Sequence, residues 1–405
     1  MAQSTPTPLL HTRTDRPLAD VRLAPARMAA GASAPTTVAG GRPSLAIVCQ
    51  QTALALVDEL GAGAIRSHFQ SRPWLKAVAD ATADGAEPLF LAGYEGDACR
   101  ILLPLALSRR HGVRRLEWLG QAVADYNLPL CEPGFFRALS EADIHALWRE
   151  AARLAGGADV VFARKQPVSV SGAENPFAAV ASGPESDQAH SRRLTRPWAE
   201  IEAELSTAKS RRRLREKLRA MEKLGDCAIQ QASGPAEIRQ CAETLMDWKR
   251  DQLASTGATN PFNDNDYRTF FLSICERGVA ELHGIFIDGA PVALTCLLVD
   301  AAGTTLYQTG FDPAYGRHSA GRILNVALMK EAAERGARFF DFGYGDEDYK
   351  RSMCDDAVDL TFSVVPLTPR GAVAALALRA ALVARRIVKH NDRLRRAAFF
   401  INRLF

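Results

Sequence analysis

The sequence predicts a mixed α/β protein built from two related domains in tandem, each a mixed sheet flanked by helices. Two strand–turn–strand segments of similar composition occur in the two halves of the chain, at residues 89–107 and 282–300. In each half a further strand, a polar loop, a helix and a final strand follow in the same order. The chain of 405 residues is also too long for one simple core and suits two ordinary domains.

The repeated elements can be matched one by one. Glu95-Gly96 separates two β-rich runs in the first half, and Asp288-Gly289 does so in the second, which predicts two β-hairpins. The next strands are expected at residues 114–120 and 304–310. Both halves then end in similar strings, "EAARLAGGADVVFARK" and "EAAERGARFFDFGYG", where a glycine follows the last helical turn and stops the helix. Four matches in the same order indicate a duplication.

Composition divides the chain into five predicted segments. Residues 1–42 are rich in Ala, Pro, Thr, Ser and Gly and are expected to be disordered. The two domains are expected at 43–200 and 229–368, with a bridging basic helix at 201–228 between them. A basic amphipathic helix is expected over 369–405. The second domain is the one that we expect to carry the functional site.

The two basic helices each allow two interpretations. In "STAKSRRRLREKLRAMEKLG" eight Lys or Arg stand against two Glu, so this helix is either a solvated bridge or a contact for a phosphate-bearing or anionic polymer. From Arg370 to the end of the chain there are nine Lys or Arg, and Asp392 is the one acid. This helix either lies on an anionic membrane face or packs on the second domain through Ala and Leu.

Composition also excludes several classes of protein. The net charge of +4 is mild for this length, so binding of DNA is not expected. The eight cysteines form no C-x-x-C pair, which favours reduced thiols in a reducing compartment, and the scattered histidines predict no metal site. The N-terminus lacks the apolar region of a secretory signal, and no run approaches 18 apolar residues. We therefore expect a cytoplasmic protein, in peripheral contact with the inner membrane if the last helix binds lipid.

The segment "RFFDFGYGDEDYKRSM" carries more chemistry than a strand end requires. On the repeat alignment Asp341 matches Phe162, after which the first half continues "ARKQPVS", so the acid-rich turn exists once. A structural device would be expected in both halves, whereas a catalytic site is needed in only one. Strand alternation places Phe340 and Phe342 on one face and Asp341 on the other. Burial would raise the pKa of Asp341 toward that of a useful base.

The turn itself has a functional and a structural interpretation. Gly343 and Gly345 break the strand, and Asp346 is expected to cap a short helix that begins at Glu347. The acids then either contact a substrate or pair locally with Lys350 and the following arginine.

A phosphate site is predicted at the helix that follows "GFDPAYGRHSAG". The small residues Ser319, Ala320 and Gly321 let the backbone approach a ligand, and the free N–H groups of a helix start bind phosphate. Arg317 and Arg322 add positive charge. The alternative is an ordinary helix that Ser319 caps.

Residues 307–350 resemble the bacterial CelD/BcsL-type acetyltransferase family of the GNAT superfamily. The motif D-F-G-x-G-D-E-x-Y-K of that family corresponds here to Asp341 through Lys350. The strings "DWK", which ends at Lys249, and "WLGQAVADYNLPL" are also similar to the family, and the resemblance extends over residues 65–367.

The resemblance implies a duplicated GNAT-like fold, related to Fem-type aminoacyl transferases. It implies transfer of an acyl group from acetyl-CoA or another acyl-CoA to an amino or hydroxyl acceptor, a sugar or precursor in exopolysaccharide or cellulose synthesis, without a metal. The string "RHSAGR" departs from the usual GNAT pyrophosphate signature. An aminoacyl-tRNA donor and a non-catalytic scaffold role in a polysaccharide-synthesis complex therefore stay open. A polysaccharide synthase is a further candidate partner for the C-terminal helix.

The resemblance and the residue types together suggest roles. Asp341 or Glu347 would act as base or orient the substrate, and Tyr349 or Tyr307 would protonate the departing thiolate. The acceptor would lie in the cleft between the two copies. The candidate catalytic residues are Asp341, Glu347, Tyr349 and Lys350, and the candidate substrate-binding residues are Asp125, Tyr126, Lys249, Tyr307, Gly345 and Asp346.

Overall fold

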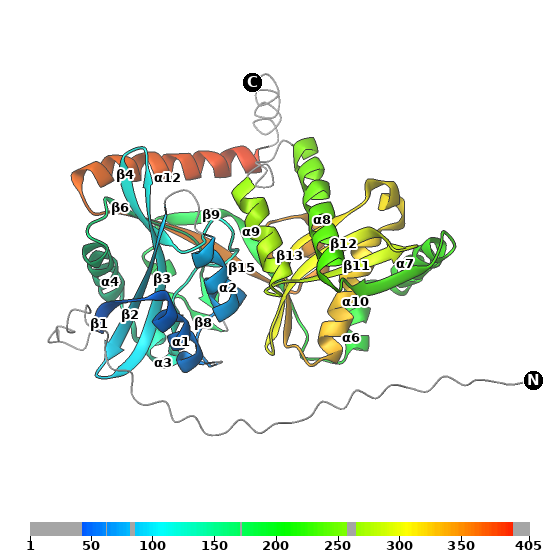
Figure 1. The fold of residues 1–405 in the computed structure, drawn as a ribbon, viewed down its shortest axis with the longest axis horizontal. Helices are drawn as coiled ribbons and strands as arrows, with labels where there is room; N and C mark the ends of the chain where they lie inside the picture. The colour runs from blue at the N-terminus through cyan, green and yellow to red at the C-terminus, as the bar shows by residue number, and fades with distance from the viewer. Residues whose placement is uncertain (1–42, 62, 82–85, 171, 257–264, 392–405) are drawn as a thin grey trace, which may run out of the picture. The chain divides into compact units, whose positions relative to one another are not determined.

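The computed structural model describes residues 43–61, 63–81, 86–170, 172–256 and 265–391. The predicted disordered segment 1–42 and the last part of the C-terminal helix, 392–405, lie outside them. The described strands form one large mixed sheet in the order β1-β2-β3-β4-β6-β15-β9-β14-β13-β12-β11-β10, with β5 paired to β3 (Figure 1). The predicted mixed α/β fold with two related halves is confirmed.

The two halves contribute equivalent strands in the same order. The first half supplies β1 (Ser44–Val48), β2 (Glu87–Glu95), β3 (Ala98–Arg110), β4 (Val113–Trp118), β6 (Val160–Pro167) and β9 (Gly183–Arg193). The second supplies β10 (Cys227–Gln231), β11 (Glu281–Ile287), β12 (Ala290–Val299), β13 (Gly303–Phe311), β14 (Phe339–Tyr344) and β15 (Asp356–Pro366). The short strands are β5 (Leu130–Cys131), β7 (Ser169–Val170) and β8 (Ala173–Glu174).

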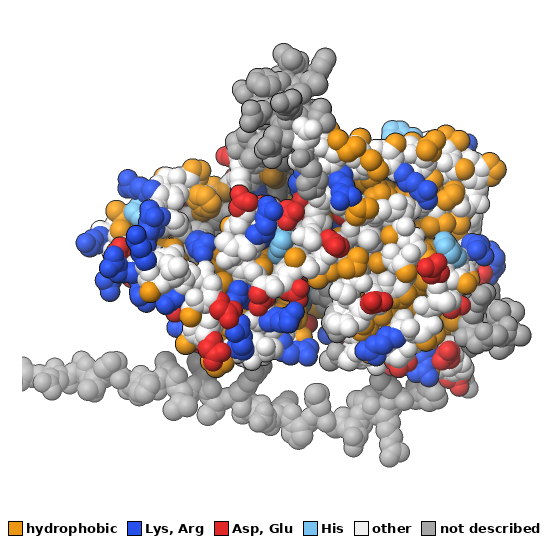
Figure 2. Space-filling view, turned by 180° about the vertical axis from the view of Figure 1, so that it is seen from behind, with side chains coloured by type: hydrophobic (Ala, Val, Ile, Leu, Met, Phe, Trp, Pro, Cys, Tyr) orange, Lys and Arg blue, Asp and Glu red, His pale blue; other side chains and the backbone are white. Residues whose placement is uncertain are grey.

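The helices repeat as well. The helices α1 (Gln50–Leu60), α2 (Arg72–Asp80) and α4 (Glu141–Leu154) correspond to α8 (Pro235–Thr256), α9 (Asn265–Glu276) and α10 (Ala320–Glu334). The others are α3 (Pro133–Ala138), α5 (Pro176–Ala179), α6 (Trp198–Leu205), α7 (Ala208–Glu222), α11 (Asp348–Met353) and α12 (Pro369–His390), with short 3-10 turns at His68–Gln70 and Pro313–His318. The basic helix α7 joins the halves, and Figure 2 shows Lys and Arg side chains gathered where it lies, at the left edge.

Both predicted hairpins form around left-handed turns. The β11–β12 turn places Asp288 at φ 50° and Gly289 at φ 77°, and the β2–β3 turn has Gly96 at φ 60°. Two consecutive residues with positive φ match the right-handed twist of the flanking strands.

The last strand of each half is inserted next to the other half. Strand β15 pairs with β6, and β9 pairs with β14, where Asp341 lies opposite Ser191. Strands β15 and β9 also pair with each other. Each of the predicted domains 43–200 and 229–368 therefore completes its sheet with a strand from the other. This exchange fixes the line along which the two halves meet, called the seam below.

The parallel strand pairs separate soon after they begin. Strands β13 and β14 pair only from Gly303 to Thr305 against Phe339 to Asp341. The equivalent strands β4 and β6 pair over two residues. Past these pairs the strands diverge, and the point of divergence between β13 and β14 is called the opening below.

The sheet is covered on both faces. Along β12, Leu294 and Cys296 pack into the core that includes α8 and α9, whereas Ala293 and Leu297 pack into the core of α10. Successive residues of a strand point to opposite faces, so α8 and α9 cover one face and α10 the other. The first-half helices α1 and α2 share the first of these cores, and Trp74 meets Phe270 edge-on at 5.5 Å.

Helix α12 lies along the first half of the sheet (Figure 1). Its Ala375 packs with Phe362 and Val364 of β15, and Leu378 and Leu382 pack beside them. Its Ala and Leu side therefore packs against a strand of the second half that is inserted into the first. Within the described ranges, none of the helices combines the length and the apolar character needed to cross a bilayer.

Candidate active site

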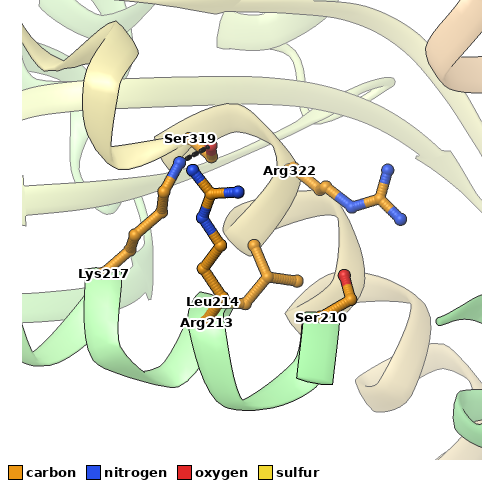
Figure 3. A pocket seen from close by; sticks show the side chains of 6 residues that line it. All are labelled: Ser210, Arg213, Leu214, Lys217, Ser319 and Arg322. Atoms are coloured by element: carbon orange, nitrogen blue, oxygen red, sulfur yellow. Dashed lines mark hydrogen bonds between the residues drawn. The ribbon is translucent and has the colours of Figure 1, made fainter. Parts of the chain in front are cut away.

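The described part of the chain contains a basic pocket of about 330 Å³ between α7 and the start of α10. Figure 3 shows the side chains of Arg213 and Lys217 on α7 and Arg322 on α10 around it. Ser210, Leu214 and Ser319 complete the lining. Two features that the sequence suggested separately, the basic helix and the phosphate-binding helix start, thus meet in one place.

The start of α10 is open to an external anion. Ser319 has φ 57° and forms no side-chain cap, so the expectation that it caps the helix is wrong. Instead its Oγ accepts a hydrogen bond of 2.6 Å from Lys217 Nζ. The first turn of α10 carries no acid. Its N–H groups and the helix dipole therefore add to the positive potential of the pocket.

The equivalent helix start in the first half has the opposite character. Ser140 accepts from the backbone N–H of Asp143, and the Asp143 carboxylate accepts from the N–H of Ser140 at 3.0 Å. Glu141 adds a second acid to the first turn of α4. This start is capped by its own side chains and repels anions. Of the two equivalent helix starts, the one in the second half is suited to phosphate.

The predicted phosphate residues do not all reach the pocket. Arg322 lines it and also donates to Ser352 of α11 at 3.1 Å, so the pocket adjoins α11. Arg317 is exposed and donates to His318, and Ala320 is buried in the core of α10. Gly321 is half-buried and does not line the pocket. Arg213 and Lys217 of α7 supply the positive charge that was predicted to come from Arg317. The run of basic residues in α7 was the sequence feature that could have indicated them.

A second polar centre forms at the seam, where Asp125 of the first half stands in the opening between β13 and β14. Gly343 has φ 68°, and any Cβ there would overlap the Asp125 carboxylate. The backbone of Tyr344 donates a hydrogen bond to that carboxylate. Glycine is thus required at position 343 both by the backbone conformation and by the approach of Asp125.

The charge of Asp125 is felt by many groups around the opening. Burial raises the pKa of Asp125, although Lys165 and Lys350 oppose the rise. After burial, the negative charge of Asp125 also contributes to the raised pKa of a group of surrounding tyrosines. These are Tyr126, Tyr267, Tyr307 and Tyr349. A half-buried carboxylate with a raised pKa among polar groups has the properties of a general base.

Asp341 ties the two halves together. Its Oδ1 accepts from the Tyr126 hydroxyl and the Gly343 N–H, both at 2.8 Å, and its Oδ2 accepts from Thr305 at 3.4 Å. Only 7% of Asp341 is exposed. Phe340 and Phe342 pack into the core of α10 on the other face, as alternation predicted. With both oxygens engaged, Asp341 positions Tyr126 and the neighbouring Asp125 and has little freedom to contact a substrate.

The titration of Asp341 gives a stability prediction. Burial raises its pKa to about 6 from an ordinary value of 3.8. The folded protein then holds the proton more tightly than the unfolded chain, so the free energy of unfolding falls as pH rises from about 4 to about 6, by about 3 kcal/mol. We expect Asp341→Asn to remove this decline, so that the stability difference between variant and wild type shifts by that amount between pH 4 and pH 7.

Urea unfolding of both proteins at the two pH values provides the measurement. Equal differences at pH 4 and pH 7 would show that Asp341 titrates normally in the folded protein. Comparison with Asp359→Asn, which removes an exposed carboxylate of β15, controls for the general effect of removing an acid.

Lys350 organises the acid-rich turn. Its Nζ donates to the Tyr344 carbonyl at 2.9 Å and pairs with Glu347 at 3.1 Å. Burial alone would raise the pKa of Glu347, but Lys350 and Lys249 outweigh it and the pKa is lowered. Burial, with Lys350 nearby, lowers the pKa of Lys249, although Glu347 opposes this. The Glu347 side chain is 57% exposed, so it is an ionised partner for cations and a weak base.

The expected cap of the short helix is not formed. The N-cap of α11 is Glu347, without a side-chain hydrogen bond, so the expectation that Asp346 caps this helix is wrong. Asp346 instead pairs with His190 of β9 at 2.8 Å. This contact turns Asp346 toward the exchanged strand β9. Gly345, at φ 127°, lies so close to Glu347 and Lys350 that a Cβ would displace them.

The two candidate tyrosines differ in their freedom. Tyr307 is 6% exposed, donates to the Val123 carbonyl at 3.0 Å and contacts the Tyr267 hydroxyl at 3.2 Å. The Tyr349 hydroxyl forms no hydrogen bond to other residues that the structure describes, and its ring meets Phe342 at 6.2 Å. Of these two tyrosines, Tyr349 is therefore the one whose hydroxyl is available as a proton donor.

Three residues near the opening were missed from the sequence. Lys165 donates to the Ala124 carbonyl at 2.6 Å and lies 5.6 Å above the Tyr344 ring. On the repeat alignment Lys165 corresponds to Tyr344, so equivalent positions of the two halves meet at the seam, which was a usable signal. His68, which contacts Thr305 at 2.8 Å, and Tyr267 lie in segments without any motif.

The described residues contain no group of three or more His, Cys, Asp or Glu side chains placed to hold a metal ion.

Comparison with known proteins gives one family match and several similar solved structures. Residues 208–351 match the family described as acetyltransferase (GNAT) domain. The crystal structure of FemX superposes with a TM-score of 0.57 at 11% identity, over 83% of this chain and all of FemX (100%). A tandem GNAT protein from the clavulanic acid biosynthesis pathway gives a TM-score of 0.49 at 15% identity, over 80% of this chain and 99% of that one. No curated protein shows significant sequence similarity. Residues 208–351 thus match a GNAT acetyltransferase domain, and the fold of the chain is similar to that of FemX.

Proposed function

We propose that the protein transfers an acyl group, acetyl in the simplest case, from acyl-CoA to an amino or hydroxyl group of a saccharide or saccharide precursor in exopolysaccharide synthesis. One observation carries this proposal. The basic pocket at the start of α10 is joined through Arg322 and Ser352 to α11, and the pKa of Tyr349 on that helix is raised by burial and, in part, by the charge of Asp125. A phosphate site and an acid–base pair are thereby joined through one short helix.

The basic pocket suits the diphosphate of coenzyme A. Arg213, Lys217 and Arg322 supply charge-assisted hydrogen bonds, and the start of α10 supplies backbone donors. A second cavity of about 180 Å³ shares Leu214 and Arg322 with it and is lined largely by apolar side chains, Trp198 among them. It would receive an apolar part of the donor.

The opening suits the transfer step. Asp125 accepts the proton of the acceptor amine or hydroxyl, whose freed lone pair attacks the thioester carbonyl. The new C–N or C–O bond forms, the C–S bond breaks, and the departing thiolate takes its proton from Tyr349. Backbone N–H groups where β13 and β14 diverge would stabilise the oxyanion. Lys165 and Lys350 favour the ionised form of Asp125, because they oppose the rise in its pKa that burial causes.

Mass spectrometry tests this function. The full chain is incubated with a panel of acyl-CoAs and a panel of amino sugars and nucleotide-linked sugars. The expected result is an acceptor heavier by one acyl group, with one free CoA released for each product. Acyl transfer to none of the saccharides would contradict the proposed acceptor class, and failure to consume any acyl-CoA would contradict the proposed donor.

A second function, transfer from aminoacyl-tRNA, is favoured by one observation. The basic surface of α7 continues beyond the pocket, because Lys209, Arg212, Arg215 and Arg219 are exposed. RNA binding to such a surface would be lost steeply with salt. If tRNA displaces bound acetyl-CoA at low salt and aminoacyl-tRNA is consumed in turnover, this second function replaces the first.

Glu347→Gln gives a contrasting prediction. Because Glu347 is exposed and its pKa is lowered, we expect less than about a tenfold loss of kcat, below the range of an essential base. Steady-state kinetics at saturating acyl-CoA provides the test. A loss of a thousandfold would move the role of base from Asp125 to Glu347.

A further inference from the structure

Helix α12 presents an apolar stripe to the outside. Val373, Leu376, Ala380, Val383 and Ile387 follow one another at alternating intervals of three and four residues, which places them on one helix face. Val373 and Leu376 are each 73% exposed, Val383 is 50% exposed and Ile387 is 54% exposed. These five residues are called the α12 stripe. Large exposed aliphatic side chains in a continuous row mark an interaction surface.

The other side of the helix is anchored, so the stripe cannot turn inward. Gly371 packs so closely on the Asp159 backbone that a Cβ would clash with its carbonyl. Arg379 donates to the Val364 carbonyl at 2.6 Å, and Lys389 donates to Asp187 of β9 at 2.6 Å. Arg370 donates to the Gly112 carbonyl at 3.1 Å, so bonds hold the helix at both ends and in the middle. The α12 stripe therefore has a fixed outward orientation.

The charge around the stripe has a single sign. Helix α12 carries five cations and no acid between Pro369 and His390, namely Arg370, Arg379, Arg385, Arg386 and Lys389. At 3.6 residues per turn, Arg379 and Arg386 flank one side of the stripe and Arg370 flanks the other. Within the described residues Arg385 and Arg386 form no ion pair. An apolar stripe on a helix that carries cations and no acid is the pattern of a helix that lies in the interface of an anionic bilayer.

We propose that α12 docks the protein on an anionic membrane surface, with the α12 stripe in the headgroup region and Arg386, at its edge, on lipid phosphates. The charge of α12 favours an anionic membrane over a second copy of the chain as the partner of the α12 stripe. Lys389 is paired with Asp187, so two α12 helices packed through their stripes would bring four unpaired cations against four, and neither helix has an acid to pair them. Anionic lipid supplies the missing charge over the whole length of the helix. The proposal is independent of the proposed acyl transfer.

Vesicle co-sedimentation of the full chain tests the proposal. The probes are vesicles of phosphatidylcholine alone and vesicles with phosphatidylglycerol added. Three variants are compared with wild type: the stripe variant Val373→Ser/Leu376→Ser/Val383→Ser/Ile387→Ser, the charge variant Arg385→Gln/Arg386→Gln, and the matched control Arg109→Gln/Arg149→Gln, which removes two exposed arginines of β3 and α4. Circular dichroism and sedimentation velocity follow folding and oligomeric state.

We expect wild type to bind phosphatidylglycerol vesicles and not pure phosphatidylcholine. The stripe variant should bind these vesicles at least about tenfold more weakly than wild type. The charge variant should lose a comparable amount of affinity, and the control should bind as wild type does. Equal binding of the charge variant and wild type would overturn the proposal, even if the stripe variant fails to fold. A wild-type dimer that the stripe variant converts to monomer, with vesicle binding unchanged, would overturn it in favour of an interface between copies.

Discussion

Asp125→Asn is expected to lower kcat by about 10² to 10⁴-fold while acyl-CoA affinity changes by less than about threefold. Asparagine preserves the shape of the side chain and its approach to Gly343, but it cannot accept the proton of the acceptor. Because burial raises the pKa of Asp125, the wild-type rate should fall with decreasing pH at a higher pH than an ordinary aspartate would give. The residual rate of the variant should not show this fall at low pH.

Steady-state kinetics from pH 5 to pH 9, with acyl-CoA affinity measured by calorimetry, checks this result. The matched control is Asp97→Asn, which removes an exposed carboxylate of the β2–β3 turn and should behave as wild type. If Asp125→Asn retained more than a tenth of the wild-type kcat, Asp125 would not be the base. Asp341 and Glu347 would then return as candidates.

The double variant Arg213→Gln/Lys217→Gln is expected to weaken acetyl-CoA binding by about 100-fold or more. Each lost cation removes a charge-assisted hydrogen bond to phosphate, and these are among the strongest polar contacts in proteins. Acetylpantetheine lacks the diphosphate and the adenosine, so its turnover at high concentration should be the same in variant and wild type. The affinity is measured by isothermal titration calorimetry and the turnover by release of free thiol.

Arg212→Gln provides the matched control for this variant. Arg212 is on the same helix and is exposed, but it pairs with Glu216 and does not line the pocket. We expect it to bind acetyl-CoA as wild type does. If Arg212→Gln weakened binding as much as the double variant, the effect would come from the general charge of α7, and the pocket would lose its assigned role.

Much of the fold could be predicted because its signals are local. Hairpin turns such as Asp288-Gly289, helix stops and alternating strands depend on short-range chemistry, and two copies of each signal reinforce one another. The exchange of β9 and β15 between the halves could not be predicted. Pairing of distant strands depends on tertiary contacts, and the sequence of an inserted strand resembles that of any buried strand.

The residues of the candidate site could likewise be predicted in part, but their relative positions could not. The single-copy turn identified Lys350 and Glu347, and the resemblance drew attention to Asp125 and Tyr126. Their relative positions follow from the seam, which only the folded chain defines. Asp341 was a candidate base or substrate-orienting group, as Glu347 was, because a lone acid in an apolar strand is costly to bury. The structure shows why it is tolerated: Tyr126, from the other half, donates a hydrogen bond to it.

The sequence indicated the two elements of the basic pocket separately and did not indicate that they meet. A helix start rich in small residues and a helix rich in arginine each had an ordinary explanation, and neither was specific alone. Their meeting around Arg213, Lys217 and Ser319 is a tertiary fact that no local pattern encodes. Capping of the equivalent first-half helix by Ser140 and Asp143, by contrast, can be predicted from their spacing. It could have been used to choose which of the two helix starts is suited to phosphate.

The most direct test of the account is a crystal structure of the full chain with bound acetyl-CoA. The account predicts that the diphosphate lies within hydrogen-bond distance of Arg213, Lys217 and Arg322. It also predicts that the thioester carbonyl lies in the opening between β13 and β14, within reach of Tyr349 and of an acceptor atom next to Asp125. A donor bound elsewhere, or one whose thioester does not reach the opening, would contradict the account.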